Sequence, residues 1–171
     1  MNNDKPTPFM AYRKAVDDAM LKFFGIDTGD AGIEAELIAR AQKEGQTPED
    51  FACWWGDKHG LTPIITQKIA TLNDLCRKAM GIAGRLVQTV GISSLPPQDQ
   101  SAIRQKVETF DAFNPDNNPY GERDFGAFDH NGHRIFWKID YYDRTLSQGS
   151  EDLTDPQQTV RVLTIMLASE Y

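Results

Sequence analysis

The sequence is short of cysteine, of positive charge and of long apolar runs. Its 18 lysines and arginines face 25 aspartates and glutamates, which gives a net charge of −7. Binding to DNA or RNA requires positive charge that releases counterions from the phosphates, so we expect no direct contact with nucleic acid. No apolar run approaches the length of a membrane span, and the first residues carry no secretory leader. We therefore expect a cytoplasmic protein that does not bind a membrane.

Motifs for catalysis are also missing. There is no Gly-x-Ser-x-Gly, and nothing in the sequence pairs Cys53 or Cys76 with His59 as nucleophile and base. The segment 81–84 has two glycines but lacks the lysine and the spacing of a phosphate-binding loop. These absences leave an enzyme unsupported, and no cofactor is expected. Both cysteines lie in apolar helical patterns, which favours buried thiols in a reducing compartment, and a disulfide between them stays open.

The most informative segment that is present spans residues 124–143. Asn131-Gly132 is the favoured pair for a two-residue turn in which both residues need positive φ. The flanking runs are aromatic and β-branched, as strands prefer. The turn sets a register in which Gly126 lies opposite Trp137 and leaves room for the indole. The same register pairs Asp129 with Arg134, and Arg123 with Asp140.

In the rest of the chain, the spacing of apolar residues indicates where helices and strands lie. Apolar residues recur at helical intervals between residues 9 and 80, and Thr47-Pro48 and Thr62-Pro63 are helix start signals. A short strand candidate at 86–90 and a helix through 103–110 follow, and the run 160–167 predicts a final, buried helix. We expect an α+β fold: an N-terminal helical part, residues 1–62, and a domain of residues 63–171. That domain would hold a small three-stranded antiparallel sheet with packed helices.

Several long motifs occupy the C-terminal three-fifths of the chain. They include Leu95-Pro96-Pro97, Asn114-Pro115-Asp116-Asn117, the run 134–143 and the run 161–171. With these motifs, residues from about 69 to 171 resemble an uncharacterised bacterial domain family, a domain of unknown function. The resemblance implies a small protein of proteobacteria that is often encoded on plasmids and other mobile elements. It brings no activity, so no catalytic residue is transferred.

One weak candidate for a metal site lies at the hairpin turn. Asp129, His130 and His133 carry suitable ligand atoms, and the two imidazoles face each other across the turn. A closed site needs about four ligands, and a catalytic site about three with a water molecule. Polar residues that flank a turn are usually in contact with solvent, and we favour that interpretation.

Carboxylates gather before and after the hairpin. The loop 116–124 could bind a hard cation, but its spacing does not match a calcium loop, and its residues are the usual turn formers. A structural loop is therefore favoured. If the protein is an enzyme, the candidate acid–base pairs are Glu122 with Asp124, or Asp140 with Asp143.

Aromatic side chains give the candidate interface. Adjacent helix residues point about 100° apart, so Trp54 and Trp55 are both buried only if their helix is enclosed. The outer face of the hairpin carries Phe125, Phe136 and Tyr142, and it needs either a covering layer or a partner. The N-terminal helices are available as cover, and we favour cover over an interface.

We expect a non-catalytic, acidic protein-interaction module of a bacterial mobile element. One expected role is inhibition of a host defence complex, by anti-CRISPR or anti-restriction action. Carboxylates, Asp116 among them, would occupy a basic nucleic-acid cleft on the partner protein, while exposed aromatic residues supply buried anchors. The alternative is a metal-assisted hydrolase or nucleotide-processing enzyme that uses carboxylates between Asp116 and Asp143.

Overall fold

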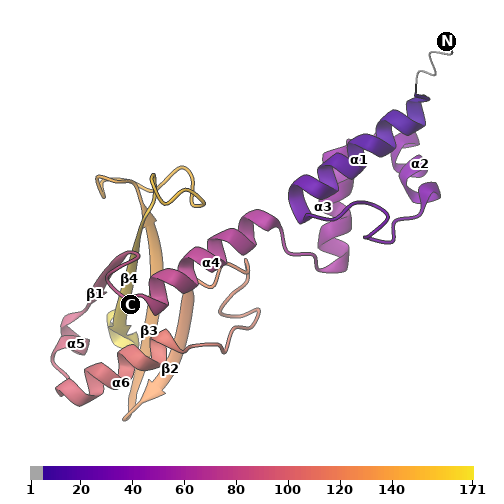
Figure 1. Ribbon diagram of the computed structural model, residues 1–171. Coiled ribbons are helices and arrows are strands. Elements are labelled where there is room, and N and C mark those ends of the chain that lie inside the picture. Colours follow the sequence, from indigo (N-terminus) through magenta and orange to yellow (C-terminus); the bar gives the residue numbers. More distant parts are fainter. Residues whose placement is uncertain (1–5) are drawn as a thin grey trace. The chain divides into compact units, whose positions relative to one another are not determined.

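The computed structural model describes residues 6–171 and shows two compact units, Met1–Ile65 and Thr66–Tyr171. Figure 1 labels their helices and strands. The α+β class expected from the sequence is confirmed. Within residues 6–171, no helix has both the length and the apolar character to cross a membrane.

The N-terminal unit contains α1 (Pro8–Phe24), α2 (Ala35–Lys43) and α3 (Pro48–His59). The start of α3 follows from its sequence: proline occupies the first turn, and the Thr47 hydroxyl accepts a hydrogen bond from the third helical N–H. The helix ends at Gly60, whose φ of 65° reaches the left-handed region.

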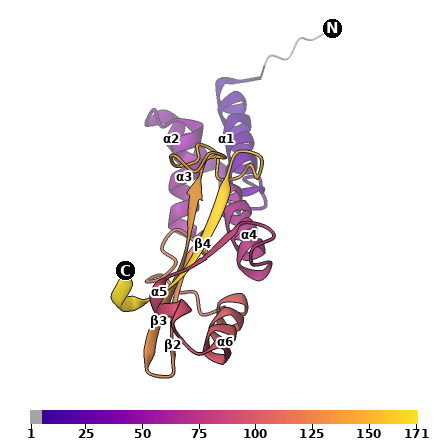
Figure 2. The same cartoon turned by 90° about the vertical axis from the view of Figure 1, so that its left-hand side faces the viewer.

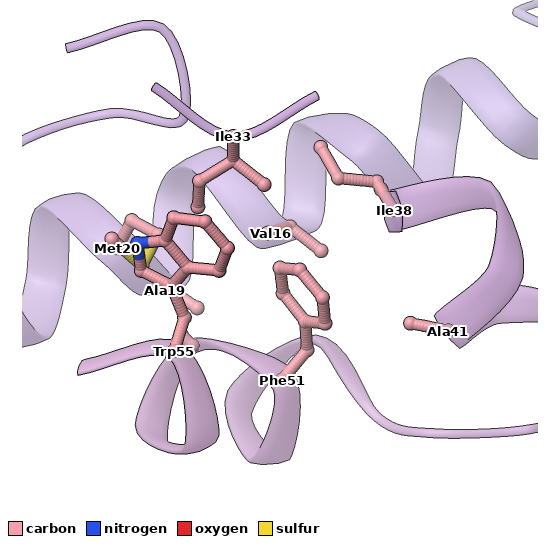
Figure 3. Close-up of a cluster of buried hydrophobic side chains, with 9 residues drawn as sticks. Val16, Ala19, Met20, Ile33, Ile38, Ala41, Phe51 and Trp55 are labelled. Carbon is pink, nitrogen blue, oxygen red and sulfur yellow. The ribbon is translucent and has the colours of Figure 1, made fainter. Parts of the chain in front are cut away.

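The core of this unit joins all three helices, as Figure 3 shows. Phe51 and Trp55 of α3 pack with Val16 of α1 and Ile38 of α2. Trp54 is the neighbour of Trp55 in the helix, so its side chain points in a different direction, away from this core. It is 41% exposed, whereas Trp55 is 9% exposed. The helix is thus only partly enclosed.

The C-terminal unit is a four-stranded mixed sheet with helices, so the expected three-stranded antiparallel sheet is wrong. The strand order is β1-β4-β3-β2, in which β1 and β4 are parallel and the other neighbours are antiparallel. In chain order its elements are α4 (Ile64–Lys78), β1 (Arg85–Gln88), α5 (Val90–Ser93), α6 (Pro97–Glu108), β2 (Phe125–His130), β3 (His133–Tyr142), β4 (Val160–Leu167) and the short 3₁₀ helix η1 (Ala168–Glu170).

The segment expected to form the final helix is instead the inner strand β4. It hydrogen-bonds to β1 on one side and to β3 on the other. A strand in that position is apolar on both faces, so its sequence lacks alternation and resembles a buried helix. The β-branched residues Val160, Val162 and Thr164 carry the signal for a strand.

The hairpin of β2 and β3 has the predicted register. Asn131 and Gly132 form the turn with φ of 46° and 81°. A Cβ atom at Gly126 would lie 2.5 Å from Nε1 of Trp137, which confirms why glycine stands opposite the indole. The expected pair of Arg123 with Asp140 is wrong, because β2 begins only at Phe125. Arg123 has a φ of 55°, and its guanidinium binds Asp74 of α4 at 2.8 Å.

The two faces of the sheet differ in their cover. Figure 2 shows α4 and α6 on the same side, and Trp137, Ile139 and Leu163 are buried beneath helices in the core of this unit. The opposite face carries Phe125 and Phe136. Tyr171, which directly follows η1, packs against both rings, 6.5 Å from Phe125 and 5.8 Å from Phe136.

Candidate functional site

A buried polar network lies where α4 meets the end of β3. Asn73 of α4 is fully buried, and its Nδ2 donates hydrogen bonds to the Tyr141 hydroxyl (2.7 Å) and to the Glu122 carbonyl (2.8 Å). Its Oδ1 accepts a hydrogen bond from Nε of Arg161 at 2.8 Å. The Tyr141 hydroxyl donates to the Glu122 carboxylate at 3.2 Å. Four polar side chains from separate segments therefore satisfy one another inside the unit.

Burial shifts the pKa values of the ionisable groups in this network. It raises the pKa of the Glu122 carboxyl, which the charge of Asp124 raises further, while Tyr141 and Arg161 act in the opposite direction. Burial also raises the pKa of Asp124, with a contribution from Asp140. Burial likewise raises the pKa of the Tyr141 hydroxyl, and it lowers the pKa of Arg161. Two neighbouring carboxyls with raised pKa values are a feature that acid–base sites share with structural networks.

Arg161 also lines a pocket of about 450 Å³. We call it the arginine pocket, because Arg85, Arg144 and Arg161 are among its lining residues; the others are Leu72, Leu75, Ile82, Ala83, Gly84, Pro156, Thr159 and Val160. As far as the described residues show, no carboxylate lines it. The pocket is formed by α4, the α4–β1 connection, the loop after β3 and the start of β4. No sequence motif marked it, since its arginines come from three separate segments.

The weak metal candidates at the turn have other partners. Nε2 of His130 lies 2.8 Å from the Asp99 carboxylate of α6, and Asn131 donates to the same oxygen. Asp129 accepts from Arg134 at 3.1 Å, as the register predicted, and His133 lies opposite His130. Across residues 6–171 the structure contains no group of three or more His, Cys, Asp and Glu side chains that could hold a metal ion.

The four candidate catalytic carboxylates do not share one pattern of contacts. Glu122 and Asp124 interact electrostatically in the buried network. Asp140 instead pairs with Lys138 at 2.9 Å. Asp143 accepts hydrogen bonds from the side chains and backbone of its own loop, which lower its pKa. The pair Glu122 and Asp124 is thus the one that the fold brings together in a half-buried environment.

The candidate interface residues fall into both units. On the sheet face opposite α4 and α6, the half-buried rings of Phe125 and Phe136 lie 5.4 Å apart, and Tyr171 packs 5.8 Å from Phe136. Tyr142 lies half-buried on the same face, next to the loop after β3. Sequence reasoning missed Tyr171, which is 76% exposed. We call Phe125, Phe136, Tyr142 and Tyr171 the aromatic face.

The remaining candidates lie outside that face. In the N-terminal unit, Trp54 is half-exposed and carries the Lys58 ammonium 4.9 Å above its ring, whereas Trp55 is buried and stacks on His59. Asp116 is exposed in the loop before β2. The thiols of Cys53 and Cys76 are both free; Cys76 is buried as expected, but Cys53 is exposed.

Comparison with known protein families finds a match in the C-terminal part of the chain. Residues 88–170 match the family described as a protein of unknown function (DUF3768). The expected similarity to an uncharacterised domain family is confirmed over this segment, while the association with bacteria and mobile elements stays a prediction. No curated protein and no solved structure matches the chain. The family description names no activity, so it assigns no role to any residue.

Proposed function

We propose that this protein is a non-catalytic interaction module that binds another protein through the aromatic face. The supporting observation is that Phe125, Phe136 and Tyr171 form one cluster on the sheet face opposite α4 and α6. Aromatic residues are enriched in the centres of protein interfaces, where they supply large, rigid contact area. Tyr171 adds an exposed ring at the rim of the cluster.

The charge of the chain supports a basic partner. A net charge of −7 favours association with a positively charged surface, such as the nucleic-acid cleft of a host defence complex. Inhibition of such a complex, by anti-CRISPR or anti-restriction action, is the finer form of the proposal. It requires that the complex weaken as salt is added, because salt screens attraction between exposed charges.

The test compares two exposed tyrosines. Tyr171 and Tyr120 are 76% and 81% exposed, but only Tyr171 packs against the aromatic face. The tagged full chain would be used to capture proteins from a bacterial host, in parallel with the variants Tyr171→Ser and Tyr120→Ser. We expect a partner that Y171S loses and Y120S retains, and whose purified complex weakens with added salt. If the Y171S variant captures the partner as well as the natural chain does, the aromatic face is not the interface.

A hydrolase remains the second candidate because Glu122 and Asp124 are half-buried neighbours with raised pKa values. This function predicts that Glu122→Gln abolishes turnover of an activated phosphoester or carboxylic ester. The amide NMR spectrum of the variant should still be that of a folded protein. It also predicts that divalent cations raise the melting temperature. Turnover that survives the substitution would exclude Glu122 as the acid or base.

A further inference from the structure

We infer that the arginine pocket binds a small organic phosphate, with the phosphate group on the exposed guanidiniums of Arg85 and Arg144 and an apolar body against the leucine and isoleucine wall. This site is separate from the aromatic face and does not depend on the protein-binding function proposed above. It combines a pocket of about 450 Å³ with three arginines and no lining carboxylate in an otherwise acidic chain.

Two arginines of the pocket carry charge that no neighbouring carboxylate compensates. Arg85 and Arg144 are exposed, and neither guanidinium forms a hydrogen bond or ion pair with any residue that the structure describes. Four of the nine other lysines and arginines of this unit form an ion pair with a carboxylate, namely Arg77, Arg123, Arg134 and Lys138. Guanidinium groups offer paired N–H donors that match the oxygens of a phosphate, and they remain charged at any physiological pH.

Arg161, the third arginine of the pocket, is held in place. Its side chain is 4% exposed, and it is fixed by Nε to Asn73 (2.8 Å) and by Nη2 to the Leu153 carbonyl (2.6 Å). No hydrogen bond within the described residues uses its Nη1. Glu122 is the carboxylate that acts electrostatically on this guanidinium, and it shares its own hydrogen bond with the Tyr141 hydroxyl. Arg161 thus adds a fixed positive charge to the lining of the pocket, and its side chain loses no further entropy when an anion binds.

One wall of the pocket is apolar. Ile82 is 90% exposed and Leu75 is 53% exposed, and both line the pocket beside Leu72. An apolar ligand body would remove these side chains from water, which favours an organic phosphate over a free inorganic ion. The volume falls within the range of about 300–1,000 Å³ that is usual for small-molecule pockets. Three positive charges favour a phosphate dianion over a carboxylate monoanion.

The experiment is calorimetric titration of the full chain with phenyl phosphate, inorganic phosphate and benzoate. We expect phenyl phosphate to bind more tightly than either of the others, because each of those lacks one part of the match. Arg85→Gln and Arg144→Gln should each weaken phenyl phosphate binding about tenfold or more. Both side chains lack partners in the structure, so these variants should fold normally. Arg13→Gln, an equal charge change at an exposed position of α1, is the matched control and should leave binding unchanged.

Amide chemical-shift changes would locate the bound probe, and we expect them at residues 82–85 and 159–161. Equal affinity for benzoate and phenyl phosphate would overturn the choice of a phosphate. Equal affinity for inorganic and phenyl phosphate would overturn the role of the apolar wall. Binding that is insensitive to R85Q and R144Q, or equally weakened by R13Q, would overturn the pocket itself.

Discussion

Replacing Gly126 by alanine tests the packing on which the C-terminal unit depends. A Cβ at this position would lie 2.5 Å from Nε1 of Trp137, and 2.7 Å from both Cε2 and Cζ2. These distances are too short for any real contact, so the indole or the β2 backbone must move. The indole is itself confined, because it is fully buried and packs edge-on against Phe110 at 5.5 Å and Phe113 at 6.3 Å.

The expected cost can be bounded from two opposing effects. Overpacking of a filled core costs about 1–3 kcal/mol. Alanine also restricts the unfolded chain, which returns about 0.4–1 kcal/mol when the native φ suits it, and Gly126 does not have a positive φ. We therefore expect Gly126→Ala to lower the free energy of unfolding by about 1–2 kcal/mol.

The matched control is Gly149→Ala. Its nearest atom would be the Tyr141 carbonyl oxygen at 3.9 Å, an ordinary contact, and its φ is also not positive. We expect this variant to be neutral or slightly stabilised, by up to about 1 kcal/mol. Urea unfolding would be followed by the amide NMR peaks of β2, β3 and β4, so that the signal comes from the C-terminal unit alone.

A double-mutant cycle with Trp137→Phe isolates the contact. The smaller ring leaves space for the new methyl group, so G126A should cost less in the W137F background than in the natural chain. The substitution also removes an indole N–H that has no partner among the described residues, and that effect cancels in the cycle. An equal cost in both backgrounds, or a G126A variant as stable as the natural chain, would refute the reasoning.

Two further predictions concern buried charges. Arg77 is 2% exposed; its Nη1 donates to the carbonyls of Val107 and Glu108 at the end of α6, and its Nη2 donates to Asp74. Arg77→Met should therefore lower the free energy of unfolding, measured in urea, by about 3 kcal/mol. A decrease below about 1 kcal/mol would contradict this structural role. Burial raises the pKa of Glu122 above its ordinary 4.5, so the folded state holds more protons and unfolding free energy falls as pH rises from about 4.5. Glu122→Gln should flatten that decline, and parallel pH profiles for variant and natural chain would contradict it.

Local signals explain why the hairpin could be predicted in detail. The turn at Asn131-Gly132 requires two positive φ angles, and few residue pairs supply them. Once the turn was placed, the period-two alternation determined every pair of β2 and β3. The start of α3 was predictable for the same reason, because Thr47 and Pro48 act within a single turn of helix.

Long-range signals were weaker, and the error at β4 shows why. An eight-residue apolar run has the same composition whether it is an inner strand or a buried helix, and only its neighbours decide. Those neighbours are β1 and β3, and the parallel pairing with β1 joins residues 85–88 to residues 162–165 across most of the unit. Without that pairing, the sheet was predicted with one strand too few.

The arginine pocket was missed together with β4, and the two errors have one cause. As a strand residue, Arg161 alternates with Val160 and Val162, so its side chain lies on the same face as the buried Leu163. A buried guanidinium needs a polar partner, since an isolated one is strongly destabilising.

That partner is also visible as an anomaly in the sequence. Asn73 interrupts the apolar face of α4 between Ile69 and Cys76, just as Arg161 interrupts the apolar run of β4. Each residue alone contradicts the pattern around it, and the hydrogen bond of 2.8 Å between them resolves both contradictions. Two polar residues that break two apolar patterns therefore predict contact between those segments, and a pair of this kind would have placed β4 beside α4 from the sequence.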